Sequence, residues 1–185
     1  MIDSIFKTLV LASCMILAVP GASVAVPATG GTSLSTHQQG MHQWQVKGGK
    51  LILITGTYQD VTTYKRSLTF YLESKPGDDW MHVPVITSET DQDTTWFSIS
   101  QGEQTVADAL VVPRAGTVEL VVADTKAGGP GPVSVRWYRL TEYSDENPYG
   151  PAYYFKKIST ASYPASARLT VEQVLSKEVA AKSKK

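Results

Sequence analysis

The sequence predicts a mainly β protein: an antiparallel β-sandwich with one C-terminal amphipathic α-helix. Apolar and polar residues alternate with a period of two in many short segments. Turn residues separate these segments at a spacing of roughly 8–12 residues, as in sandwiches and barrels. Helical spacing of apolar residues occurs in a single segment, near the C-terminus. Between residues 41 and 165 we therefore expect about seven to nine short strands.

Alternation is clearest in the segment 67–72, where Leu68, Phe70 and Leu72 fall on one face of an extended chain. The segments 117–122 and 133–138 repeat the pattern. A glycine pair at residues 47–50 and the Pro-Gly-Asp sequence within residues 74–79 have the composition of turns. These segments and turns predict antiparallel strands joined by short connections.

All four tryptophans lie in strand-like segments and are expected in the core: Trp44, Trp80, Trp96 and Trp137. If two of them were instead exposed on one face, stacking on a carbohydrate or another flat ligand would be favoured.

The helix is predicted to begin after Thr170. Thr170 as N-cap and Gln173 three residues later fit a capping box. Four apolar residues follow with helical spacing: Val171, Val174, Leu175 and Val179. This narrow stripe favours a helix packed on the sandwich, rather than one that binds a partner or an anionic membrane surface.

The first 25 residues have the pattern of a signal peptide. Lys7 precedes an apolar run at residues 9–19, and small residues ending at Ala25 form a cleavage site. We expect a signal peptide at 1–25, a flexible lead-in at 26–40, the sandwich at 41–165 and a helix with a basic tail at 166–185. The protein would then be periplasmic or secreted. Lipidation at Cys14 and an uncleaved N-terminal anchor are the alternatives.

Composition excludes several classes of protein. The 185 residues carry 17 basic and 17 acidic side chains, a balance that argues against nucleic-acid binding. A single cysteine excludes an intramolecular disulfide and every Cys-based zinc site. Neither a serine-nucleophile motif nor a phosphate-binding glycine loop is present, so we expect no cofactor and no catalysis.

The strongest candidate for a binding site is a tyrosine-rich, turn-rich stretch at residues 143–155. Tyrosine combines rigid contact area with a hydrogen-bonding tip, and asparagine and glycine adapt to a ligand. The predicted ligand- or partner-binding residues are Tyr143, Asn147, Tyr149, Tyr153 and Tyr154. The alternative is a connection that folds back over the end of the sheet and buries its rings.

Two weaker candidates remain. Glu89, Asp91 and Asp93 would face one way in an extended chain and could hold calcium, although a solvated acidic surface is the simpler interpretation. A dispersed hydrolytic site would begin with His82 and the nearby carboxylates of Asp78 and Asp79.

These observations predict an exported, non-catalytic binding protein of the bacterial envelope. A protective role fits this class: sequestering a small molecule such as an antibiotic, as in resistance or immunity, or inhibiting a lytic enzyme. The alternatives are a hydrolase with a dispersed catalytic site, and a structural or assembly subunit of the envelope. An exposed sheet edge could also form a homodimer.

Overall fold

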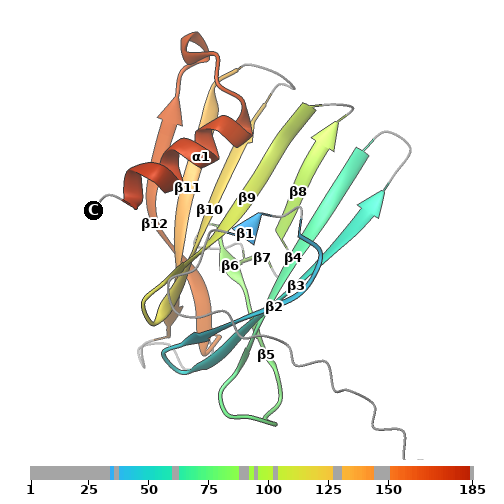
Figure 1. Cartoon of the computed structure of the whole chain (residues 1–185), viewed down its shortest axis with the longest axis vertical. Helices are drawn as coiled ribbons and strands as arrows, with labels where there is room; N and C mark the ends of the chain where they lie inside the picture. The colour runs from blue at the N-terminus through green and yellow to red at the C-terminus, as the bar shows by residue number, and fades with distance from the viewer. Residues whose placement is uncertain are drawn as a thin grey trace, which may run out of the picture.

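The computed structural model describes residues 34–35, 38–59, 63–87, 92–93, 96–101, 104–126, 131–143 and 151–183 (Figure 1). The predicted signal peptide and Cys14 lie outside these residues, so cleavage of the signal peptide and lipidation at Cys14 both stay predictions. In the described part of the chain, no helix has the length and apolar character needed to span a membrane.

The fold is mostly antiparallel β-structure with one α-helix, as predicted. Within the described residues the strands are β1 (Leu34–Ser35), β2 (Gly40–Val46), β3 (Gly49–Gln59), β4 (Thr63–Glu73), β5 (Met81–Val83), β6 (Val85–Ile86), β7 (Gln92–Asp93), β8 (Trp96–Gln101), β9 (Gln104–Arg114), β10 (Thr117–Thr125), β11 (Val133–Glu142) and β12 (Tyr153–Tyr163). A 3₁₀ turn, η1 (Ala165–Ala167), precedes helix α1 (Val171–Lys182).

Hydrogen bonds join the strands in the order β2-β3-β4-β8-β9-β10-β11-β12-β6-β7. This continuous path bends over on itself, so that strands β2 to β5 form one layer and strands β9 to β12 the other (Figure 1). The inner faces of both layers share one core, in which Phe70 and Phe155 meet with ring centroids 4.6 Å apart. The predicted inward side chains Leu68, Phe70 and Leu72 are all buried there. The sandwich prediction is therefore confirmed.

A second core lies on the outer face of strands β9 to β11, under helix α1 (Figure 1). Strand β10 is consequently buried on both faces: Val118 and Leu120 contribute to the inner core, and Val121 to the core under α1. The helix begins as predicted, because Thr170 and Gln173 form both hydrogen bonds of the capping box. Its Glu178 carboxylate accepts hydrogen bonds from Trp137 at 2.8 Å and from Tyr163 at 2.6 Å. These bonds fix α1 on the sheet.

The structure differs from the sequence prediction in several local features. Six of the strands that the structure describes are nine to eleven residues long, so they are not short. Pro84, which has no N–H to donate, separates β5 from β6. Trp80 lies in the turn before β5 and is 44% exposed, so its placement in the core was wrong. Trp137 is buried as predicted, and Trp44 is half-buried at the edge of the core. The side chain of Trp96 is not among those that the structure describes.

Candidate binding surface

The tyrosine-rich stretch starts from two strand ends that are joined at their base. The N–H of Tyr143 donates to the carbonyl of Ala152 at 2.8 Å, which closes the connection between β11 and β12. The rings of Tyr143 and Tyr154 lie against each other with centroids 5.7 Å apart. Asn147 and Tyr149 lie outside the described residues, so their predicted role stays a prediction.

Tyr153 points to the opposite face from Tyr154, because neighbouring residues of a strand alternate. It packs against the inner core, and a Cβ atom added to Gly48 would lie only 2.2 Å from its hydroxyl oxygen. Burial raises the pKa of Tyr153, and the nearby Glu142 carboxylate raises it further. The structure therefore separates this predicted residue from the Tyr143–Tyr154 pair and gives it a packing role.

A buried carboxylate surrounded by cations lies on the same outer face. The side chain of Glu119 is 4% exposed. Arg139 donates to it at 2.7 and 3.1 Å and Arg114 at 3.3 Å, and the Lys182 ammonium lies 3.9 Å away. Burial alone would raise the pKa of Glu119, but the hydrogen bond from Arg139 and the neighbouring positive charges outweigh it and hold the pKa below its ordinary value. The carboxylate is therefore ionised at neutral pH.

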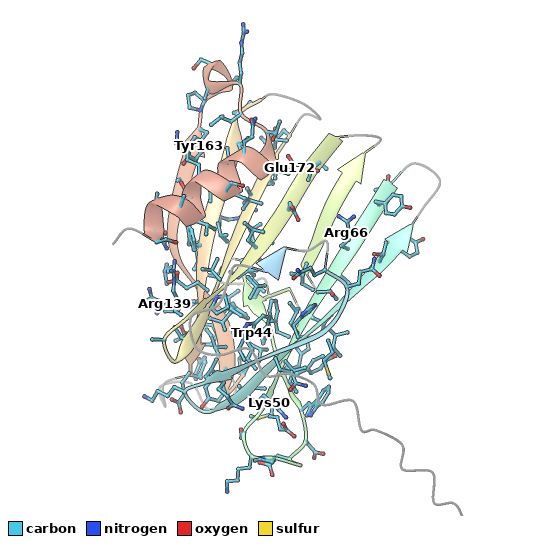
Figure 2. The ribbon with its side chains drawn as sticks, viewed as in Figure 1. Trp44, Lys50, Arg66, Arg139, Tyr163 and Glu172 are labelled. Carbon is cyan, nitrogen blue, oxygen red and sulfur yellow. The ribbon has the colours of Figure 1, made fainter. Side chains whose placement is uncertain are left out.

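Strand register places this cluster beside the tyrosine pair. Arg139 lies opposite Glu119 on β10 and opposite Lys156 on β12, and the next outward pair is Thr141 with Tyr154. Figure 2 shows Arg139 near the C-terminal end of α1, the end that carries Lys182. We refer to these residues as the cationic–aromatic surface: Arg114, Arg139, Lys156, Lys182, Tyr143 and Tyr154.

This surface has more positive charge than its own carboxylate can balance. Three cations, Arg114, Arg139 and Lys182, face Glu119, and the Glu178 carboxylate also acts on Lys182. Lys156 is directly opposite Arg139, an arrangement of like charges that destabilises a strand pair. Burial lowers the pKa of Lys182; the Glu119 and Glu178 carboxylates act to raise it, and the charges of Arg139 and Arg114 act to lower it. An added anion would relieve this repulsion. A ring on that anion could pack against Tyr143 and Tyr154.

No sequence pattern signals the cationic part of this surface. Arg139 and Lys156 look like ordinary outward residues of alternating strands. Lys182 fits the general preference for a cation at the C-terminal end of a helix. Their proximity depends on how α1 crosses the sheet, and Lys182 is held there partly by the Trp137 ring, 3.6 Å from its ammonium.

The structure describes only some residues of the other two candidate sites. Glu89 and Asp91 lie outside the described residues, and Asp93 falls in β7 without a described side chain, so the calcium hypothesis stays untested. Among the described residues, no three His, Cys, Asp or Glu side chains gather as a metal site. His82 packs edge-on against Tyr71 at 5.4 Å, and the Asp78 carboxylate accepts the Lys75 N–H at 3.1 Å.

Comparison with known proteins supports the fold alone. No family model and no curated protein sequence matches this chain. It is similar to the solved crystal structure of a protein named CarG, with a TM-score of 0.57 and 21% identity. The similarity covers 74% of this chain and 94% of CarG. At this identity the match indicates a shared architecture.

Proposed function

We propose that this chain is an exported, non-catalytic binding protein that sequesters an anionic small molecule carrying a ring, such as an antibiotic with a carboxylate. The observation that carries this proposal is the excess of positive charge around buried Glu119, beside the Tyr143–Tyr154 pair. Export is supported by the signal-peptide pattern of the first 25 residues.

The geometry favours a small anion. The side chain of Arg139 is 52% exposed, so its guanidinium can bind Glu119 and still present N–H groups to solvent. A guanidinium recognises planar carboxylates and phosphates through paired hydrogen bonds. Lys156 supplies a second charge from the neighbouring strand, and the two tyrosine rings supply apolar contact area. Binding and release of such a ligand require no bond to be made or broken, which fits a sequestering role.

The Arg139→Gln substitution should weaken binding of phenyl phosphate at least tenfold, because a hydrogen bond to a charged group contributes about 1.5–3 kcal/mol. Isothermal titration calorimetry of the purified chain measures this, with phenol as the uncharged analogue of the probe. Lys126→Gln is the matched control. It removes the same charge from an exposed residue at the far end of β10 and should leave binding unchanged.

Binding of phenol as tight as that of phenyl phosphate would contradict an anion site. Equal losses in the Arg139 and Lys126 variants would indicate non-specific charge attraction, which also contradicts the proposal. Chemical conversion of the ligand during the titration would contradict the non-catalytic assignment.

A further inference from the structure

The outer face of the β2–β5 layer is separate from the cationic–aromatic surface. Helix α1 contacts strands β9, β10 and β11, which belong to the other layer of the sandwich. Large side chains are exposed on and beside the β2–β5 layer: Met41 is 51% exposed, Ile54 40% and Trp80 44%. Met41 and Ile54 are cross-strand partners on this face, and the Trp80 ring lies against Tyr71.

Cross-strand register orders this face into rows. One row is apolar and aromatic at its centre and comprises Gln43, Ile52, Tyr71 and His82. The next row is polar and comprises Gln45, Lys50 and Glu73. Ile52 is fully buried although it belongs to neither core, because its neighbours on this face cover it. Rings and hydrogen-bonding groups therefore lie side by side.

Trp80 is exposed but held in place. Its ring centroid lies 6.0 Å from that of Tyr71, and the nearby indole contributes to lowering the pKa of Glu73. Glu73 is itself fixed, since it also pairs with Lys50 and accepts the Gly77 N–H at 2.9 Å. A ring fixed in this way loses little conformational entropy when a ligand packs on it.

The Glu73 carboxylate also borders a small, half-open cavity of about 90 Å³. Its walls are more apolar than polar and are formed by Gln45, Gly49, Lys50, Glu73, Ser74 and Pro76. The hydrogen bond from Lys50, followed by that from the Gly77 N–H, lowers the pKa of Glu73. The carboxylate therefore remains an acceptor at neutral pH, and its charge is balanced by Lys50. The amide of Gln45 adds both a donor and an acceptor.

We infer that this face binds a pyranose ring of a neutral saccharide, with the sugar stacked on Trp80 and its hydroxyl groups directed to the cavity. A pyranose has an apolar C–H surface that suits an indole ring, and an edge of hydroxyl groups that both donate and accept hydrogen bonds. The charge balance of Lys50 and Glu73 disfavours an anion here, in contrast to the cationic–aromatic surface. This site is independent of the proposed function.

The test begins with the fluorescently labelled chain on an array of neutral glycans, followed by calorimetry with the glycan that binds most tightly. Trp80→Ala should weaken binding at least tenfold, and Gln45→Ala should weaken it about threefold through a lost hydrogen bond. Tyr58→Ala is the matched control, because Tyr58 is an aromatic residue that is more exposed than Trp80. It lies on β3 six residues from Ile52, which is about 20 Å along the strand. It should leave binding unchanged.

Absence of binding to every neutral glycan would overturn the inference, as would undiminished binding by folded Trp80→Ala and Gln45→Ala. Conversion of a dimer to a monomer by Trp80→Ala in size-exclusion chromatography would assign the face to a second copy of the chain and also overturn it. Arg139→Gln should not affect glycan binding, so the two sites can fail independently.

Discussion

The Trp137→Ala substitution is expected to lower the free energy of unfolding by about 3–5 kcal/mol, the range for large-to-small changes at buried aromatic residues. Trp137 is 1% exposed and packs between β11 and α1. The change also removes the hydrogen bond to Glu178 and the ring beneath the Lys182 ammonium. The helix should therefore loosen along with the loss of stability. Urea unfolding measures the free energy, and amide hydrogen exchange measures the protection of α1.

The matched control is Trp80→Ala, which removes the same side chain from a site that is 44% exposed. It should cost at most about 1 kcal/mol, since substitutions at exposed positions change stability little. Equal losses in the two variants would contradict the assignment of Trp137 to the core under α1. Unchanged exchange protection of α1 in Trp137→Ala would contradict its role in holding the helix.

The second large effect is expected for Glu119→Gln, which leaves Arg114, Arg139 and Lys182 facing one another around a neutral amide. Breaking a buried ion pair costs about 3–5 kcal/mol, and we expect a smaller loss of about 2–3 kcal/mol because Arg139 is half exposed. Urea unfolding at pH 7 measures this loss. A loss below about 0.5 kcal/mol would show that the cations do not depend on this carboxylate.

The difference in unfolding free energy between wild type and Glu119→Gln should depend on pH. The pKa of folded Glu119 lies below its ordinary value of 4.5. The stability it contributes is therefore fully present above the unfolded pKa and is lost as the pH falls through the folded pKa. The difference between wild type and Glu119→Gln should shrink below pH 4.5. Glu73 also has a lowered pKa, but it is common to both proteins and cancels. A difference that stays constant down to pH 3 would contradict the assignment.

The fold class could be predicted because sheet burial leaves a period of two in the sequence. Leu68, Phe70 and Leu72 show this pattern, and the hydroxyl and amide side chains of Thr170 and Gln173 mark the start of α1. Trp80 was misplaced because a strand-like local sequence does not reveal that the chain turns at that point. Strand β10 is buried on both faces because α1 covers its outer face, whereas β3 has no such cover at Ile54, which is exposed. The position of α1 is not visible in the sequence of either strand.

Only the aromatic part of the candidate site could be predicted. Tyr143 and Tyr154 stand out by composition, and the structure brings them together. Arg139, Lys156 and Glu119 come from three strands whose alignment follows from sheet register. Register depends on long-range pairing, so the charge excess around Glu119 becomes visible only in the folded chain.

The most direct test of the proposed function maps where an anionic ring binds. Backbone amide chemical shifts in two-dimensional NMR, recorded while phenyl phosphate is added to the folded chain, give this location. We expect shift changes concentrated at Arg139, Thr141, Tyr154 and Lys156, with none at Trp80 or His82. Changes confined to other strands, or no change at millimolar phenyl phosphate, would contradict the proposed function.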